Sequence, residues 1–314
     1  MSGEKKHLVI IAGPTCSGKS ELARAMALEF NGQIINADSM QVYSDLQVIT
    51  SRPSNEDLLS IKHKMYGYLD GSKRGNVASW HKLAIKEILN SEEEKNLPIV
   101  VGGTGLYLNS LINGISTIPE PTKDIKEYVN EKILKLGLGA IFDELKKIDA
   151  VGSKKIKPND KQRIVRSYEV FLSSGKPLTF WQSKEILKPL RHSKIYNLLV
   201  LPEREVLYQM CNHRFDKMIV SGAIEEVAKL KDRCLDPSLP VMNAIGVREL
   251  SCFLEGDTPL EDAVSKSKQL TRNYAKRQVT WFKNQFNSSS VVFEQFSESL
   301  CTKIFPKIRQ FLLT

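Results

Sequence analysis

The sequence predicts an α/β fold, in which helices flank a parallel sheet and a helical insertion divides the chain of the sheet domain. Short apolar runs at residues 8–12, 33–37 and 98–101 each end in polar or glycine residues, which is typical of buried parallel strands. A further apolar run at residues 196–201 follows a stretch with helical patterns, many basic residues and no strand pattern. We therefore predict a core domain of residues 1–119 and 192–314 and a helical insertion domain of residues 120–191.

The composition is that of a globular, basic protein. The chain has 314 residues, of which 41% are hydrophobic, and no segment approaches the length of a membrane span. The net charge of +9 favours a polyanionic partner. The five cysteines are scattered without a CxxC pair, so neither a disulfide framework nor a zinc site is expected. Because there is no room for a signal peptide before the first strand, we expect a cytoplasmic protein.

A glycine-bounded loop joins the first strand to the first helix. Residues 13–20 read Gly-Pro-Thr-Cys-Ser-Gly-Lys-Ser, after an apolar strand and before a helical pattern, which is the context of a nucleotide- or ATP-binding P-loop. Gly13 and Gly18 allow several backbone N–H groups to point into one concavity, and the helix N-terminus adds its positive dipole. Lys19 supplies a positive charge, and the Ser20 hydroxyl is a ligand for Mg²⁺.

This loop refines the predicted fold to a P-loop NTPase-like sheet. The loop predicts a polyphosphate ligand without saying which one. The predicted diphosphate- or nucleotide-binding residues are Gly13, Pro14, Thr15, Cys16, Ser17, Gly18, Lys19 and Ser20, with Ser20 as the metal ligand.

Polar residues also follow the second and third strands, at the edge where the P-loop lies. Asp38 comes after the strand at 33–37, and Thr104 follows two glycines after the strand at 98–101. Since ligands of parallel sheets bind beyond the carboxyl ends of the strands, we expect a composite site there. Asp38 is placed to hold magnesium or to accept a proton, with a helix cap as its alternative role. Thr104 offers a hydroxyl, with a flexible turn as the alternative.

Basic residues on predicted helices are candidates for contact with a polyanion. In the insertion, Gln162, Arg163 and Arg166 lie in the first turns of a helix that Asp160 is expected to cap. Arginines three residues apart share one helix face and bind phosphates well, although a solvated charged face is the usual outcome for such a run.

Two further arginines and one further helix belong to the same class of candidates. Arg214 and Arg248 each lie among apolar helix residues, where each is either a charge partner in the site or half of a structural ion pair. The long helix predicted at 260–286 carries basic residues beside aromatic ones. A helix of this composition suits a nucleic-acid interface.

Several blocks of the sequence resemble the tRNA dimethylallyltransferase (tRNA isopentenylpyrophosphate transferase) family. The most specific are the P-loop, Asn-Ala-Asp-Ser-Met-Gln-Val-Tyr at residues 36–43 and Val-Gly-Gly-Thr-Gly-Leu-Tyr at residues 101–107. Further blocks extend the resemblance over nearly the whole chain, at residues 159–163, 174–178, 243–249 and 271–282. With no C-terminal zinc finger, the chain resembles the bacterial type. Residues 62–70 depart from a His-His-Leu-Ile-Asp pattern of many members, which leaves the role of His63 open.

The resemblance implies a reaction. Such enzymes transfer a dimethylallyl group from dimethylallyl diphosphate to N6 of the adenosine 3′-adjacent to the anticodon in tRNA, releasing diphosphate. The P-loop would then hold the leaving diphosphate rather than ATP, with Mg²⁺ as the cofactor. The implied catalytic residues are Asp38 as the base, Thr104 as its orienting neighbour or a diphosphate contact, and Lys19, Arg214 and Arg248 as groups that stabilise the leaving charge.

The resemblance also implies a macromolecular partner, the anticodon stem-loop of tRNA, bound mainly by shape and phosphate contacts. The enzyme is expected to be a monomer that does not associate with a membrane. The residues implied to contact tRNA are Asp38, Ser39, Met40, Gln41, Thr104, Lys126, Gln162, Arg163, Ile164, Val165, Arg166, Arg272, Lys276 and Arg277.

Three alternatives compete with this hypothesis. An adenylate isopentenyltransferase would prenylate a free nucleotide, although the basic insertion argues against it. A P-loop kinase of a small metabolite usually has an apolar strand that ends in aspartate, or an arginine-rich lid, and the sequence shows neither. An RNA-binding protein with a purely structural P-loop would catalyse no transfer.

Overall fold

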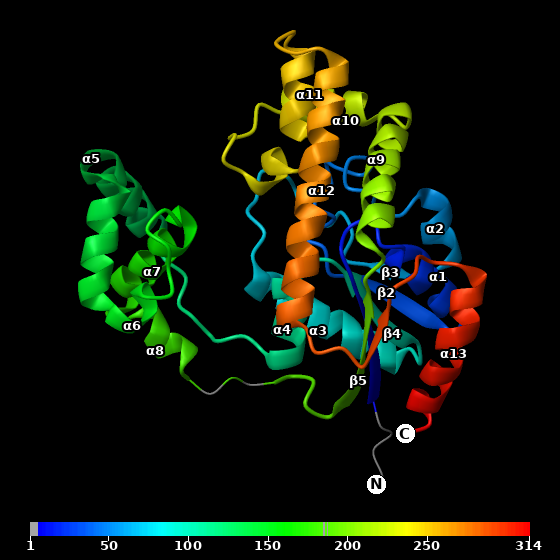
Figure 1. Ribbon diagram of the computed structural model, residues 1–314. Helices are drawn as coiled ribbons and strands as arrows, with labels where there is room; N and C mark the ends of the chain where they lie inside the picture. Colours follow the sequence, from blue (N-terminus) through cyan, green and yellow to red (C-terminus); the bar gives the residue numbers. More distant parts are fainter. Residues whose placement is uncertain (1–5, 185, 187) are drawn as a thin grey trace. The chain divides into compact units, whose positions relative to one another are not determined.

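The computed structural model describes residues 6–184, 186 and 188–314, and its centre is a six-stranded sheet of parallel neighbours (Figure 1). The strand order is β3-β2-β4-β1-β5-β6, so the strand before the P-loop lies between two others near the middle of the sheet. This confirms the predicted α/β class. The strands are β1 Lys6–Ala12, β2 Gly32–Asn36, β3 His63–Lys64, β4 Leu97–Gly102, β5 Ser193–Val200 and β6 Ser290–Val292.

The helices agree with the main sequence predictions. They are α1 Lys19–Glu29, α2 Asn55–Ser60, α3 Val77–Glu93, α4 Gly105–Asn113, α5 Lys123–Ile148, α6 Ala150–Ser153, α7 Lys161–Ser174, α8 Leu178–Gln182, α9 Arg204–Val220, α10 Ala223–Asp232, the 3-10 helix η1 Pro240–Asn243, α11 Val247–Leu254, α12 Leu260–Gln285 and α13 Glu298–Leu312. Four of these, α2, α4, α6 and α8, were not predicted individually, and most of α6 lies in residues 151–160, which were expected to form a loop. The short helix α2 depends on a capping box, in which Ser54 and Asp57 exchange side-chain and backbone hydrogen bonds.

The alternation of side chains along β1 divides the core between the two faces of the sheet. Leu8 and Ile10 belong to one apolar cluster and Val9 and Ile11 to the other, and all four are fully buried. Successive strand residues point to opposite faces, so a strand with helices on both sides needs an unbroken apolar run. Burial of each such side chain contributes about 1.5–3 kcal/mol.

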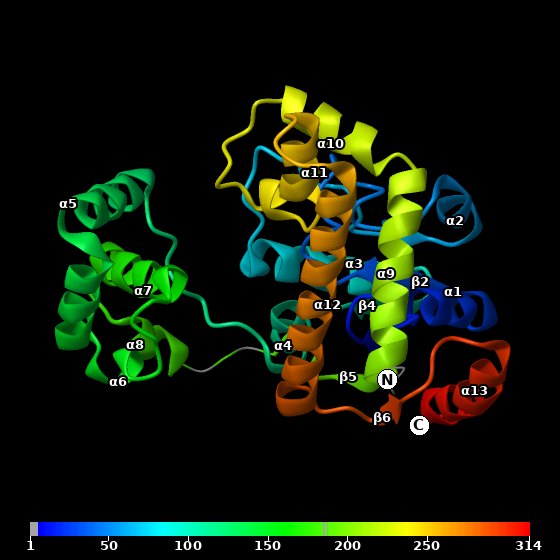
Figure 2. The same cartoon turned by 45° about the horizontal axis from the view of Figure 1, so that its top comes forward.

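Helices cover both faces of the sheet (Figures 1 and 2). Residues of α1 and α13 pack against Val9 and Ile11, whereas residues of α3 and α4 pack against Leu8 and Ile10. The long helices α9 and α12 lie side by side in both views. No helix in the described part of the chain combines the length and the apolar character that crossing a membrane requires.

The chain divides into two compact units. One comprises Met1–Ile112 and Pro189–Thr314, and the other is Asn113–Lys188, where the sequence predicted divisions at 120 and 191. The second unit has its own apolar core, which includes Val129, Phe142 and Ile164. Its longest helix, α5, is interrupted at Gly137, where φ is 80°.

Candidate active site

A cavity of about 700 Å³ lies in the core unit, where the P-loop, the end of β2 and the helices α9 and α12 meet. The P-loop and Asp38, which follow separate strands, both border it at one edge of the sheet, whereas Thr104 does not. Its polar and charged lining includes Thr15, Ser17, Lys19, Ser20, Asp38, Ser39, Gln41, Arg214, Tyr274 and Arg277, and its apolar lining includes Met40, Ile49, Phe215, Met218, Ala244 and Ile245.

The P-loop is shaped for an anion. Gly18, with φ of 84°, precedes α1 in the left-handed conformation that favours glycine. Lys19 folds back over the loop, and its Nζ donates a hydrogen bond to the carbonyl of Pro14 at 3.1 Å. The Ser17 hydroxyl is buried and has no hydrogen-bond partner among the described residues. Such a loop presents donors that a bound polyphosphate can satisfy.

Two cations face this loop from different elements. Burial lowers the pKa of Lys19, and the nearby charge of Arg214 lowers it further, while the Asp38 carboxylate opposes both effects. Arg214 projects from α9, and its Nε is buried without a hydrogen-bond partner in the part of the chain that the structure describes. An unsatisfied buried guanidinium N–H costs free energy until an anion accepts from it. The pair therefore favours a strongly negative ligand.

Asp38 is held by its own backbone rather than by a cation. Its N–H donates to the Asn36 side chain at 2.9 Å, and its Oδ1 accepts from the N–H of Met40 at 2.9 Å. Among the described residues, no hydrogen bond reaches Oδ2. The carboxylate is half-buried at the cavity wall, and together with burial its charge raises the pKa values of Tyr66 and Tyr274. The side chain thus borders the cavity, where a base would act.

Thr104 lies behind this carboxylate. Its Oγ1 accepts from the N–H of Ser39 at 2.9 Å and donates to the Ser39 hydroxyl at 3.3 Å. It does not line the cavity. The contacts place Thr104 as a support for the turn that carries Asp38; a direct contact of Thr104 with a diphosphate stays a prediction.

Sequence reasoning missed Gln278, which connects two strand ends. Its Oε1 accepts from the N–H of Thr15 and its Nε2 donates to the carbonyl of Gly103, both at 2.8 Å. A Cβ at Gly103 would lie 2.4 Å from this Nε2, so the close approach requires glycine. The available signal was helical spacing, because Gln278 lies four residues after Tyr274 and seven after Thr271, on the inward face of α12.

A pair of cysteines was also missed. Cys16 of the P-loop has a φ of 63° and packs against the cluster that contains Cys211 of α9. The contact with Cys211 lowers the pKa of Cys16 to about 6; burial opposes this shift, and Arg214 and Lys19 make smaller contributions that lower the pKa further. The same contact raises the pKa of Cys211. Cys16 thus lies in the P-loop with Arg214 and Lys19 nearby, and both of these charges favour its thiolate form.

The remaining predicted residues of the core unit lie at different places. Arg248 is exposed on α11 and does not line the cavity. Arg272 donates from α12 to the Asn212 side chain of α9. Lys276 and Arg277 are exposed on α12 and line a shallow depression beside it. His63, half-buried on β3, contacts the carbonyl of Ile61 at 2.9 Å, and its role stays open.

The predicted residues of the insertion belong to the second unit. Lys126, Gln162 and Arg163 are exposed, and Asp160 caps α7 as predicted by accepting from the N–H of Arg163. Arg166 and Val165 are half-buried. Ile164 is fully buried in the core of the unit, so its side chain packs the insertion and is not available to contact RNA.

Comparison with known proteins gives one consistent result. The IPP transferase family matches residues 41–285. The chain is 42% identical to the tRNA dimethylallyltransferase of Zymomonas mobilis over 91% of this chain and 90% of that protein. It is 31% identical to the solved tRNA isopentenylpyrophosphate transferase of Bacillus halodurans, with a TM-score of 0.71 over 98% of this chain and 97% of that one.

A second solved structure gives closer geometric agreement at lower identity. A eukaryotic dimethylallyltransferase acting on tRNA superposes with a TM-score of 0.82 at 28% identity, covering 96% of this chain and 77% of that one. On the strength of the family match and of a relative above 40% identity along most of its length, the chain belongs to the tRNA dimethylallyltransferase family.

Proposed function

We propose that this protein transfers a dimethylallyl group from dimethylallyl diphosphate to N6 of the adenosine 3′-adjacent to the anticodon in tRNA, and releases diphosphate. The observation that carries the proposal is the arrangement of one cavity. Lys19 and Arg214, whose buried Nε has no hydrogen-bond partner among the described residues, lie on the side of the P-loop. The Asp38 carboxylate lies after the end of β2, which β4 separates from the strand before the P-loop. Cations for a leaving group and a base for a nucleophile thus face the same space.

The charges account for the bond changes. The allylic C–O bond breaks, its electron pair stays on the diphosphate, and Lys19, Arg214 and the P-loop N–H groups stabilise that charge. The exocyclic nitrogen of adenine forms the new C–N bond and gives up a proton, which Asp38 accepts. The base must leave its stack to reach the cavity.

The apolar lining supplies a place for the prenyl chain. Ile49, Phe215 and Met218 belong to one apolar cluster and border the cavity. Ile49 and Phe215 pack close to Gly246, whose backbone has the left-handed conformation. A Cβ added at Gly246 would lie 2.8 Å from the Ile49 Cδ1 atom. A five-carbon chain gains free energy by leaving water for such a surface.

The residues fit magnesium as a partner of the diphosphate rather than as a resident ion. The described residues contain no group of three or more His, Cys, Asp or Glu side chains that could hold a metal. Mg²⁺ commonly keeps one or two protein ligands and binds phosphate oxygens and waters besides. The exposed Ser20 hydroxyl at the start of α1 is the proposed ligand. When bound, the ion neutralises charge on the leaving group.

The basic helices supply the proposed tRNA contacts. Arg277 lines both the cavity and the depression on α12, which links the reacting base to a phosphate-binding surface. Lys126, Gln162 and Arg163 are exposed on the insertion and are proposed to bind the stem-loop. The enzyme is proposed to act as a monomer in a reducing, cytoplasmic setting, and the five free cysteines support that setting.

The experiment compares acceptors. Labelled dimethylallyl diphosphate is incubated with the protein and with tRNA, AMP or neither. We expect label in tRNA alone. Label only in AMP would assign the chain to the adenylate isopentenyltransferases, and label in neither acceptor would contradict prenyl transfer.

A further inference from the structure

A carboxylate on α10 binds three consecutive backbone N–H groups of the segment that follows β2. Oε1 of Glu226 accepts from Gln47 at 2.6 Å and from Val48 at 2.9 Å, and Oε2 accepts from Ile49 at 2.8 Å. The segment lies 177 to 179 residues before Glu226 in sequence. Bonds from N–H groups to an ionised carboxylate are about twice as strong as neutral ones.

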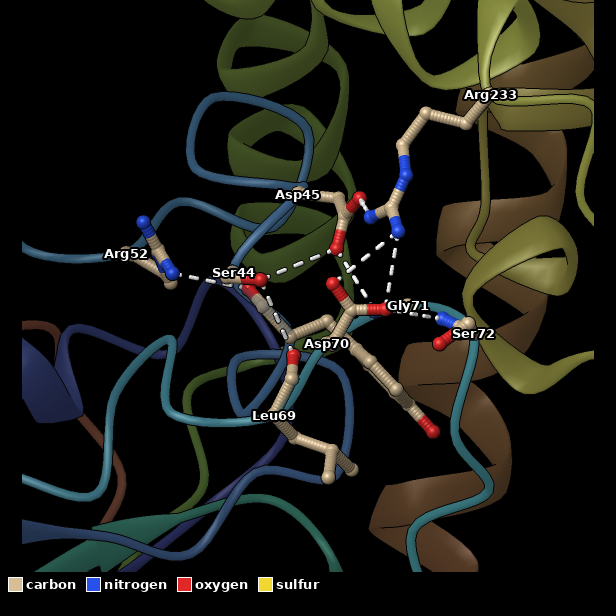
Figure 3. Close-up of polar contacts among 9 residues, drawn as sticks. Ser44, Asp45, Arg52, Leu69, Asp70, Gly71, Ser72 and Arg233 are labelled. Carbon is tan, nitrogen blue, oxygen red and sulfur yellow. Dashed lines mark hydrogen bonds and ion pairs between the residues drawn. The ribbon is translucent and has the colours of Figure 1, made fainter.

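The end of α10 holds the same segment a second time. Figure 3 shows the Arg233 guanidinium between the carboxylates of Asp45 and Asp70. The Asp45 side chain is only 6% exposed, and its Oδ2 also accepts from the N–H of Gly71 at 2.9 Å. Glu226 in α10 and Arg233, the residue directly after this helix, therefore hold the segment on both sides of Leu46, at residues 47–49 and at Asp45.

The segment held by Glu226 and Arg233 continues into part of the cavity wall. Ile49, Thr50 and Ser51 border the cavity directly after the bonded N–H groups. The Gln41 side chain, also in the wall, donates to the carbonyls of Thr50 and Ser51, each at 2.9 Å. Ser51 has a φ of 53°, so this turn is not a relaxed extended chain. A wall without regular structure depends on such outside contacts for its position.

We propose that Glu226 is a positioning residue for the prenyl-donor end of the site. It does not line the cavity; it fixes the backbone at residues 47–49 and through it the Ile49 side chain against Phe215 and Gly246. The inference rests on the proposed reaction, because it assigns the apolar wall to the dimethylallyl chain. If this part of the wall becomes more mobile, the dimethylallyl chain binds more weakly, although no charged catalytic group has been removed.

The test compares Glu226→Gln with Glu225→Gln. Both changes remove one negative charge from the first turn of α10, so their effects on the helix dipole match. Glu225 is exposed and binds no N–H group of the segment. A glutamine at 226 keeps the shape but has one acceptor oxygen, and its NH₂ group opposes an N–H.

Two measurements are made on each full-length variant. Hydrogen exchange at the amides of Gln47, Val48 and Ile49 is expected to accelerate about tenfold in Glu226→Gln, in line with a lost charge-assisted bond, and to stay as in wild type in Glu225→Gln. At saturating tRNA, KM for dimethylallyl diphosphate is expected to rise about tenfold in Glu226→Gln, with kcat changed less than about threefold.

Each outcome decides a separate point. Unchanged hydrogen exchange at residues 47–49 would show that Glu226 does not hold this backbone. Faster exchange with the same KM and kcat as Glu225→Gln would show that Glu226 holds the backbone but does not position the site. Failure of wild type to prenylate tRNA would contradict the proposed function, while the exchange data would still report whether Glu226 holds the backbone. If Glu226→Gln does not fold, Glu226→Asp keeps the charge, withdraws it by one methylene, and is expected to show the same pattern.

Discussion

The Oε1 atom of Gln278 accepts a hydrogen bond from the N–H of Thr15 at 2.8 Å, which connects α12 to the P-loop. The same side chain donates to the carbonyl of Gly103, so one buried glutamine joins the ends of β1 and β4. An anion site needs its N–H groups in place before the ligand arrives, because reorganisation subtracts from binding. Gln278 contributes to that preorganisation from outside the loop.

Replacing Gln278 with methionine is expected to destabilise the protein. The change keeps the length of the side chain but leaves a buried N–H and a buried carbonyl unpaired, which costs about 2 to 4 kcal/mol of unfolding free energy. Urea unfolding of this variant is compared with Gln269→Met, which alters an exposed glutamine of the same helix. Equal midpoints for the two variants would show that the two hydrogen bonds contribute nothing to stability.

The Asp38→Asn variant is expected to lose turnover and keep its affinity for tRNA. Asparagine preserves the shape and can still accept from Met40, but it cannot take up the proton of the attacking amine. General-base catalysis contributes roughly 10²- to 10⁴-fold, so single-turnover rates should fall by at least about 10². Filter binding of tRNA serves as the control. Turnover at the wild-type rate would exclude the base role.

Cys16 is expected to react with iodoacetamide at a lower pH than an ordinary thiol. The thiolate is the reactive form, so the rate rises as pH passes through the pKa, which is about 6 for Cys16. Peptide mass spectrometry against pH reads all the cysteines at once, and Cys301, whose pKa burial raises, is the internal control.

Pyrophosphate is expected to slow this alkylation, because the proposed leaving group would occupy the loop that carries Cys16. If the alkylation rate of Cys16 reaches its midpoint at a pH near that of Cys301, the contact between Cys16 and Cys211 would be contradicted. Alkylation at a rate independent of pyrophosphate would place the diphosphate elsewhere.

Binding of tRNA is expected to weaken steeply with salt, since each neutralised phosphate releases counterions. The Arg163→Ala variant should lower the slope of log K against log salt by about one. Lys307→Ala removes an equal charge from α13, which does not border the cavity, and should leave the slope unchanged. A flat response in wild type would mean that the positive charge of the protein lies away from its interface with RNA.

The sequence predicted those parts of the site that depend on local order along the chain. The P-loop and Asp38 follow apolar strands directly, and parallel strands bring their ends together whatever the rest of the fold does. Ile164 was assigned to tRNA as a member of a continuous block, although its spacing from Tyr168 already placed it on the buried face of α7.

Gln278 and Glu226 could not be predicted in the same way. Each acts on segments 175 or more residues away in sequence, through the docking of α12 and α10. No local pattern distinguishes a glutamine that reaches the P-loop from one that faces solvent, apart from the inward side of its helix. Their roles follow from tertiary packing, which single-sequence periodicity does not contain.

The 263-residue separation of Thr15 and Gln278 also has a consequence for biosynthesis. A ribosome that adds about 5 to 20 residues per second needs roughly 13 to 53 s to pass from one to the other. During that time the nascent chain carries a complete phosphate loop without the glutamine that preorganises it. A truncated translation product that ends before α12 therefore has the motif but lacks the finished anion site.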